Sequence, residues 1–371
     1  MEGPLYEQIY NYLMGKIQSG ELTSGSRVPS EKELAEQFRV SRITSKKALE
    51  MLAAAKVIER VQGKGSFVAE GWSDSSQSVQ QSAAVPQKWK LVGLMLPDFA
   101  DSYGLRLIHG IEERCSELGC HMLMKITYDK STEEEEAIRS FQQLGVDGFI
   151  IFPVHGEHYN PELLRLVLDK QPIVLVDRYL KGLAACSVYT DNRAAANELT
   201  TYLIQQGHSK IGFISLPAEN TSTIEDRVQG YTDALLRHGH RLESRYLMMN
   251  LYSSVPRSFE ERNIKIDFEN VRAFVELNPE LTAFVAAEYN LALILREVLL
   301  NMGKSIPEDV SIVCFDSPHN AFGNHMFTHI AQNEFDMGRR AADLLHQQWN
   351  EQEVVYQNIV PHQFIKGEST L

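Results

Sequence analysis

The chain has 371 residues, more than one ordinary domain holds, so we expect two or three structural units. Hydrophobic residues make up 43% of it and charged residues 23%, which is ordinary for a soluble globular protein. No apolar run is long enough to span a membrane, and the N-terminus lacks a basic segment followed by an apolar run. The sequence therefore predicts a cytoplasmic protein with no membrane partner.

The cysteines predict buried thiols rather than disulfide bonds. None of the four belongs to a CxxC motif, and all stand in apolar or helical contexts. A disulfide framework is unusual in a chain of this length without a secretory signal. The four residues are Cys115, Cys120, Cys186 and Cys314.

The net charge of −13 argues against nucleic acid as a partner, but the charge is unevenly distributed. Between Arg39 and Lys64 there are seven basic residues against two acidic ones, a local balance of +5. A basic segment on an acidic chain would confine phosphate attraction to one module. A charged helix face in solvent is the simpler alternative, so the motif around the charges has to decide.

That motif begins with three helices. Apolar residues at helical spacing from Leu5 to Ile17 predict the first. Ser30 and Glu33 form a capping box that starts the second, and Ser41 is a suitable N-cap for a third over residues 42–55. Two short β segments, 57–60 and 66–69, then flank a glycine-containing tip. This order predicts a winged helix-turn-helix, a small α+β DNA-binding domain over residues 1–69.

The third helix has the composition of a recognition helix. Ala48, Leu49 and Leu52 form its apolar stripe, while short hydroxyl and long basic side chains gather near its N-terminus. Such side chains reach base edges and phosphates when the helix enters a major groove. The exposed set is Arg42, Thr44, Ser45, Lys46 and Lys47.

The segments GSRVPSEKELAEQFRVSRITSKKAL and IERVQGKGSFV resemble the GntR-type winged-helix family over residues 4–69. Three positions depart from the common family pattern: Ser45 replaces a valine, Lys46 an arginine and Lys56 a glycine. Replacing arginine by lysine trades a two-pronged donor for a point charge. The resemblance, together with the helix face, implies DNA contacts by Lys32, Arg42, Thr44, Ser45, Lys46, Gln62, Gly63 and Lys64.

Residues 70–88 are rich in Ser and Gln and predict a flexible linker. From residue 89 onward, apolar strands alternate with helices, which predicts parallel sheets covered on both faces. Two such series indicate an α/β domain of two lobes over residues 89–371, with a ligand cleft at the carboxyl ends of the strands. The expected strands are 91–96, 121–126, 148–152, 172–176, 187–190, 210–216, 283–288, 311–316 and 360–366. The expected helices are 105–118, 132–144, 194–206, 227–238, 291–302 and 335–349.

The sequence offers little for catalysis or for a cofactor. No dinucleotide or P-loop motif follows a strand, and no GxSxG is present. His155 and His158 form an HxxH, but no cysteine or carboxylate clusters with them. We therefore predict no catalytic residue, no metal site and no cofactor.

Polar residues instead follow several strands or open helices, among them Asp101, Arg178 and Asp316, with the aromatic residues Phe99 and Tyr103 nearby. Carboxylates, an arginine and aromatic rings suit a neutral, polyhydroxylated ligand, because hydroxyls need several donors and acceptors and sugar C–H faces pack on rings. Each residue taken alone could equally be a strand-end cap or an ion pair.

Residues 90–371 resemble the effector-binding half of LacI/GalR-type repressors, which is itself similar to periplasmic sugar-binding proteins. The motifs that carry this are HGIEE, GVDGFIIFP, VLVDR, VYTDN, QQGHSKIGFI, RVQGY and IPEDVSIVCFDS. The resemblance implies effector contacts by Asp191, Arg227, Asp316 and Gln332. Where the family commonly has Asn-Asp, this chain has Glu288-Tyr289, so Glu288 is a candidate replacement contact. The effector set is Phe99, Asp101, Tyr103, Arg178, Asp191, Arg227, Glu288, Asp316 and Gln332.

The combination of the two modules resembles the arabinose repressors of bacilli. It implies a homodimer that binds double-stranded operator DNA, represses carbohydrate-utilisation genes and is released by a small sugar such as L-arabinose. Three alternatives stay open: a sugar that acts as co-repressor, a nucleoside or partner protein as effector, and an α/β enzyme.

Overall fold

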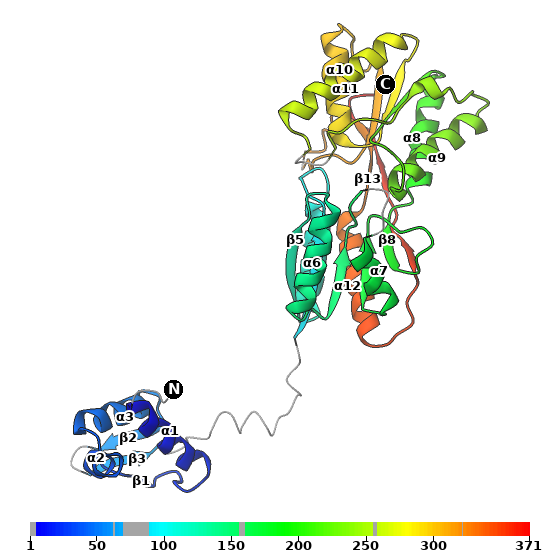
Figure 1. Ribbon diagram of the computed structural model, residues 1–371. Helices are drawn as coiled ribbons and strands as arrows, with labels where there is room; N and C mark the ends of the chain where they lie inside the picture. The colour runs from blue at the N-terminus through cyan, green and yellow to red at the C-terminus, as the bar shows by residue number, and fades with distance from the viewer. Residues whose placement is uncertain (1–4, 62–63, 70–88, 156–159, 255–257, 321) are drawn as a thin grey trace. The chain divides into compact units, whose positions relative to one another are not determined.

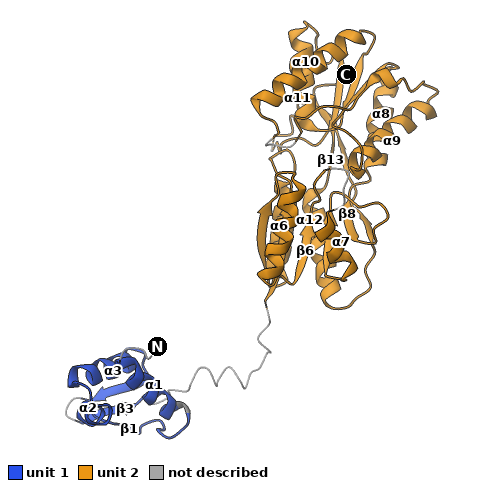
Figure 2. Ribbon diagram, in the orientation of Figure 1, with its two compact units in different colours: residues 1–88 blue, residues 89–371 orange. Residues whose placement is uncertain are grey.

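The computed structural model describes residues 5–61, 64–69, 89–155, 160–254, 258–320 and 322–371. The chain divides into two compact units, residues 1–88 and 89–371 (Figure 2). The linker predicted over residues 70–88 lies outside the described residues. In the part of the chain that is described, no helix combines the length and the apolar character needed to cross a membrane. The four cysteines are free and buried, as predicted.

The first unit packs three helices on a small antiparallel sheet whose strand order is β1-β3-β2 (Figure 1). Its core joins Ile9 and Leu13 of the first helix to Leu34 of the second and Leu49 of the third. Strand β1 was not predicted, because two residues are too few to show the alternation of apolar and polar side chains that marks a strand. The elements are α1 (Leu5–Gln18), β1 (Arg27–Val28), α2 (Glu31–Phe38), α3 (Arg42–Ala54), β2 (Ile58–Val61) and β3 (Gly65–Val68).

Both predicted helix starts are confirmed. The hydroxyl of Ser30 accepts from the backbone N–H of Glu33, and the Glu33 carboxylate accepts from the backbone N–H of Ser30 at 2.6 Å. The hydroxyl of Ser41 accepts from the backbone N–H of Thr44 at 3.2 Å. Each cap pairs a backbone donor that the first helical turn leaves unsatisfied.

The second unit contains two lobes. In the first lobe, six parallel strands follow the order β14-β8-β7-β6-β4-β5. Helices α5 and α12 cover one face of this sheet, and α6 and α7 cover the other. The elements are β4 (Lys90–Leu96), α5 (Leu105–Glu117), β5 (Cys120–Ile126), α6 (Ser131–Gln143), β6 (Gly148–Ile151), α7 (Pro161–Leu168), β7 (Ile173–Val176), β8 (Cys186–Tyr189), α12 (Glu334–Trp349) and β14 (Gln357–Ile359).

The second lobe repeats this arrangement with the strand order β10-β9-β11-β12-β13-β15. Helices α8 and α9 pack on one face, and α10 and α11 on the other (Figure 1). The elements are α8 (Asn192–Gln205), β9 (Ile211–Ile214), α9 (Ser222–Arg237), a 3-10 turn (Ser244–Tyr246), β10 (Leu247–Met248), α10 (Glu261–Leu277), β11 (Ala283–Ala286), α11 (Tyr289–Asn301), β12 (Ser311–Phe315), β13 (Thr328–Ala331) and β15 (Gln363–Ile365).

The strand expected over residues 360–366 is present as β15, and strands β10, β13 and β14 were not predicted. One expectation for this unit is wrong: β15 runs antiparallel to β13, so the second sheet is not wholly parallel. Strand β14 is parallel to β8 and therefore ends at the cleft, so the chain enters the second lobe from the edge at which its parallel strands end, and β15 runs in the opposite direction to them. Helices α7 and α10 were not predicted.

The described chain passes between the lobes three times: between β8 and α8, between β13 and α12, and between β14 and β15. Helix α12 therefore follows the last parallel strand of the second lobe but packs in the first. Figure 1 shows this as an orange-red helix among the cyan and green elements. The polar residues near these passages are consequently brought to the cleft between the lobes.

The C-terminus of α3 gives a stability prediction. Lys56 follows the helix with φ +56°, its N–H donates to the Ala53 carbonyl, and the N–H of Val57 donates to the Leu52 carbonyl. This Schellman pattern favours glycine at the left-handed position. We expect Lys56→Gly to stabilise the first unit by about 1 kcal/mol and to raise its melting temperature by a few degrees in calorimetry.

The matched control is Ala55→Gly, because Ala55 has φ −76° and gains nothing from glycine's freedom. It should not raise the melting temperature. A lower melting temperature for Lys56→Gly would contradict the argument.

Candidate DNA-binding face and ligand cleft

The predicted DNA-contacting side chains gather on one face of the first unit. Lys32, Arg42 and Arg60 line a groove between α2, α3 and the sheet, and Gly65 of β3 closes one side of it. Lys46 and Lys64 are also exposed, and Thr44 is half-buried. Of the predicted wing-tip residues, Gln62 and Gly63 lie outside the described residues.

Acidic side chains on the same unit pair with these cations. Lys32 lies 3.9 Å from Glu36 and Lys46 lies 3.7 Å from Glu50, all four side chains being more than half exposed. Exposed pairs of this kind contribute little to stability. The lysines can therefore exchange a carboxylate for a phosphate at small cost.

The prediction of Ser45 as a DNA contact is wrong. Its side chain is 0% exposed, and its hydroxyl donates to the Glu31 carbonyl at 2.7 Å and to the Arg42 carbonyl at 3.1 Å. Ser45 lies three, four and seven residues before Ala48, Leu49 and Leu52, so it shares their buried stripe. Its function is to join α3 to the start of α2.

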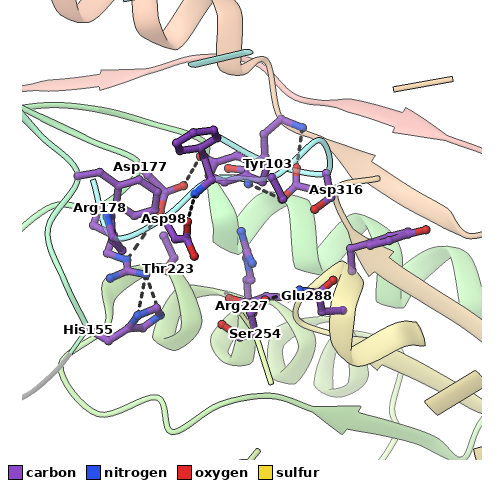
Figure 3. A pocket seen from close by; sticks show the side chains of 18 residues that line it. Asp98, Tyr103, His155, Asp177, Arg178, Thr223, Arg227, Ser254, Glu288 and Asp316 are labelled. Carbon is purple, nitrogen blue, oxygen red and sulfur yellow. Dashed lines mark hydrogen bonds and ion pairs between the residues drawn. The ribbon is translucent and has the colours of Figure 1, made fainter. Parts of the chain in front are cut away.

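The second unit has a cavity of about 90 Å³ between its lobes (Figure 3). Its lining comes from segments that follow β4, β6, β7, β10, β11, β12 and β13, from the first two turns of α9 and from the first turn of α11. Seven of the nine predicted effector residues line it: Phe99, Tyr103, Arg178, Arg227, Glu288, Asp316 and Gln332.

On the side of the first lobe, the polar groups are held in place by one another. The Tyr103 hydroxyl donates to Asp177, and Arg178 donates to the Pro153 carbonyl at 2.7 Å (Figure 3). Arg178 also lies 2.7 Å from Nε2 of His155, whose backbone N–H donates to Asp129 at 2.8 Å. Arg178 is 6% exposed, so its guanidinium is fixed rather than mobile in solvent.

On the side of the second lobe, Arg227 takes the corresponding place. It is 4% exposed, its Nε donates to Asn192 at 2.8 Å, and a terminal nitrogen donates to the Ala287 carbonyl at 2.6 Å. Its guanidinium carbon lies 3.8 Å from the centre of the Phe315 ring, a cation–π geometry. Arg227 thus joins α9 to β12 and to the first passage between the lobes.

Two buried carboxyls, those of Asp316 and Glu334, have raised pKa values. Burial raises the pKa of Asp316 to about 7, although the charge of Arg227 and an amide donor from Gln332 at 2.9 Å act in the opposite direction. Burial, followed by the charge of Asp316, raises the pKa of Glu334 to about 8. Glu334 accepts from the backbone N–H of Gly104 at 2.5 Å, which links α12 to the start of α5.

Among the described residues, four lining residues each keep a buried polar atom without a hydrogen-bond partner. Three of these atoms can accept, Oγ of Ser254, Oε2 of Glu288 and Oε1 of Gln332, and the fourth, Nε of Arg178, is a donor. Unpaired buried polar atoms are costly, at about 1–3 kcal/mol each, and uncommon in folded proteins. Since three of the four can accept, the cavity suits a ligand that brings several donors and at least one acceptor.

Two of the predicted effector residues do not line the cavity. Asp101 is exposed, and Asp98 of the same loop takes its place. Asp191 caps α8 by accepting from the backbone N–H of Ala194 at 2.9 Å, and it lines a separate groove on the second lobe. That cap turns Asp191 away, and the next residue, Asn192, makes the contact with Arg227. Both predictions are therefore wrong as cavity contacts.

The cavity also contains residues that the predicted effector set omits. His155 was considered only as a metal ligand, and its expected partner His158 lies outside the described residues. Ser254 follows a segment without a clear hydrophobic period, whereas Asn290 follows the strand predicted over residues 283–288. Asn290 donates to the Ser254 carbonyl at 2.6 Å and fixes that loop. Only proximity in the fold reveals these residues.

The buried carboxyls predict that the second unit loses stability as the pH rises. The pKa values of Asp316 and Glu334 are about 7 and about 8 in the folded chain, above the value of about 4 expected in an unfolded one. Between these limits the folded state binds more protons, so the free energy of unfolding falls from about pH 5 to pH 8. The Glu334→Gln variant keeps an acceptor for Gly104 but cannot ionise. We expect it to melt at a higher temperature than the parent chain at pH 8, and its melting temperature to fall less steeply as the pH rises.

The control for this measurement is Glu308→Gln, because Glu308 is exposed. Its melting temperature should follow the parent chain at every pH. If the melting temperature of Glu334→Gln falls with pH as steeply as that of the parent chain, ionisation of Glu334 does not cause the loss of stability.

Comparison with known proteins agrees with both halves of this description. Residues 88–368 match the family described as periplasmic binding proteins and sugar binding domain of LacI family, and residues 5–68 match bacterial regulatory proteins of the gntR family. The chain is 29% identical over 352 residues to the arabinose metabolism transcriptional repressor of Geobacillus stearothermophilus, covering 92% of this chain and 90% of the relative. The repressor of the same name from Halalkalibacterium halodurans is 25% identical over 344 residues, covering 92% and 88%.

Among solved structures, transcription regulator CcpA of Lactococcus lactis superposes with a TM-score of 0.65 at 23% identity, covering 76% of this chain and 100% of that one. At this identity the likeness concerns the fold alone. The predicted fold class, a small helix-turn-helix domain followed by a two-lobed α/β domain, is confirmed. Since the LacI-type match spans most of the chain and the gntR-type match spans the N-terminal unit, the chain belongs to the LacI family of sugar-binding-domain proteins and is a transcription regulator with a gntR-type DNA-binding unit.

Proposed function

We propose that this regulator is a cytoplasmic homodimer that represses carbohydrate-utilisation genes and leaves its operator when a small neutral sugar binds between the lobes. A pentose such as L-arabinose is the leading candidate, since two relatives that cover most of the chain are named for arabinose metabolism. In this proposal residues 70–88 link the two units. It includes no catalytic step, in keeping with relatives that are transcription regulators.

The observation that carries the effector proposal is the set of unpaired acceptors in the cavity. Ser254, Glu288 and Gln332 each leave one buried polar atom without a partner. A sugar supplies several hydroxyl donors on one small ring, so it can pair all three at once. The cavity volume of about 90 Å³ holds several water-sized groups, which suits a single sugar ring rather than a longer oligosaccharide.

The charges of the lining favour a ligand without negative charge. Asp98, Asp177 and Glu288 line the cavity together with Asp316, against two arginines. Both arginines already donate to backbone carbonyls. Glu288 stands where related effector domains commonly have an asparagine, and an ionised carboxylate only accepts. The ligand atom that faces Glu288 must therefore be a donor, and a phosphate or carboxylate group would meet repulsion there.

Control of DNA binding follows from the passages between the lobes. Arg227 contacts Asn192 beside the first passage, and Gln332 lies in the second. A ligand that pairs groups on both lobes favours one lobe arrangement over another. In a dimer, two α3 helices have to sit about one DNA turn apart on a pseudo-palindromic operator. A coupling of a few kcal/mol that alters this spacing is enough to release the DNA.

L-arabinose binding tests the effector proposal. We expect millimolar L-arabinose to raise the melting temperature of the full chain by mass action and to lower its affinity for operator DNA in fluorescence anisotropy. Glu288→Gln keeps the shape but loses the charged acceptor, so sugar affinity should fall about tenfold. The control Asp101→Asn, outside the cavity, should bind like the parent chain. If no pentose or hexose shifts the melting temperature, the sugar-sensing proposal fails.

For the operator we propose contacts by Lys32, Arg42, Thr44, Lys46 and Lys64. Lys64 at the wing is exposed and is a point charge on a flexible stem, so we assign it to the phosphate backbone. Lys64→Ala should weaken binding to all sequences alike and reduce the slope of log affinity against log salt by about 1. Lys304→Ala, an exposed lysine of the second unit, is the control and should leave the slope unchanged. A sequence-dependent loss would instead place Lys64 at a base edge.

A further inference from the structure

Ile43 is an apolar side chain in an unusual place. It is 80% exposed, more than any other large hydrophobic side chain in the described part of the first unit. Single exposed apolar residues are common on proteins and need no explanation by themselves. The position of Ile43 is what gives it meaning, because it is the second residue of α3 and stands between Arg42 and Thr44.

The phase of α3 directs Ile43 away from the protein. The helix buries Ser45, Ala48, Leu49 and Leu52. At 3.6 residues per turn, Ile43 lies almost opposite the centre of that stripe. Lys46 and Lys47, both exposed, lie on either side of it. If these cations approach DNA, Ile43 is the side chain between them that faces the groove.

No structural role in the unit accounts for Ile43. It is absent from the hydrophobic core that joins α1, α2 and α3. With Ser41 as the N-cap, the apolar contact that often steadies a helix start would pair positions 40 and 45 rather than 43. Isoleucine is also a poorer helix former than the lysine, arginine or glutamine that an exposed helical position usually carries.

The chemistry of the major groove supplies a partner. Its base edges present hydrogen-bond donors and acceptors, which an isoleucine cannot pair, and one apolar group, the C5 methyl of thymine. A β-branched side chain is stiff at χ1, so little freedom is lost when it is ordered. We propose that Ile43 reads thymine in each operator half-site by packing on the C5 methyl group. This inference rests on the proposed role of α3 as the operator-reading helix.

Replacing thymine by deoxyuridine removes only the methyl group, so it tests the contact directly. The full chain is first used to select bound duplexes from a random pool at fixed salt. Each thymine of the selected site is then replaced by deoxyuridine, one base at a time, and affinities are measured for the parent chain and for Ile43→Ala. We expect one position in each half-site at which loss of the methyl weakens the parent chain about fourfold, the effect of one buried methyl-sized group.

The inference is tested by whether the effect of removing the thymine methyl depends on the side chain at position 43. Ile43→Ala should bind the thymine operator more weakly than the parent chain and be insensitive to deoxyuridine at that position, while Ile43→Val should lie between the two. Leu277→Ala, which truncates a 76% exposed leucine of the second unit, is the matched control and should behave like the parent chain. Melting curves for all variants check that the fold is intact.

Two results would overturn the inference, and they separate it from the proposed function. If a sequence is selected but no deoxyuridine weakens the parent chain, or Ile43→Ala remains equally sensitive, Ile43 does not read a methyl group and operator binding by α3 stands. If the chain selects no sequence at all, the operator-reading role of α3 fails and this inference fails with it.

Discussion

The cleft of the second unit depends on two arginines that are almost completely buried. A buried charge is tolerated only when polar groups replace the water it has lost. Arg178 is placed between the Pro153 carbonyl and His155, and Arg227 between the Ala287 carbonyl and Asn192. Backbone carbonyls and side-chain groups thus take the role of solvent. The positions of the cleft-forming loops follow from this, since moving one of them would remove a hydrogen-bond partner from a buried guanidinium.

The reading face of the first unit is stiffened in a comparable way by one residue, Glu31. Its carbonyl accepts from the buried hydroxyl of Ser45, which joins α2 to α3. Its carboxylate pairs with Arg60 of β2, which joins the helices to the sheet. Ser45 and Arg60 come from separate elements of this unit, so the groove lined by Lys32 and Arg42 has fixed walls. A basic groove of defined shape is better suited to a duplex than mobile lysines would be.

Much of this organisation is local and could be predicted. Helix caps, strand runs and the basic segment depend on neighbouring residues, and the structure has them where the sequence indicates. Two errors were avoidable by the same local rules. The apolar stripe of α3 already puts Ser45 inside, and an aspartate directly before a helix, such as Asp191, is a preferred N-cap. In both cases the position of the residue along the helix, rather than the chemistry of its side chain, decides where the side chain lies.

Other features could not be predicted from local pattern. The strand segments look alike in sequence, and nothing in residues 357–366 shows that β14 belongs to the first lobe and β15 to the second. The cavity residues Ser254 and His155 come from loops whose positions depend on packing across the whole unit. They come to line the cavity only when both lobes are folded, and the chain passes between the lobes three times to build them.

The chain segments near the passages between the lobes also place two ionisable carboxyl groups at the cleft. Asp316 directly follows β12 of the second lobe and Glu334 begins α12 of the first, and the charge of Asp316 contributes to the raised pKa of Glu334. Near neutral pH these two carboxyls therefore resist ionising together. A ligand that donates hydrogen bonds to Asp316 stabilises its ionised form, and this makes ionisation of Glu334 harder. Ligand binding in the cavity and the protonation of Glu334 are thus linked, although Asp316 and Glu334 belong to different lobes.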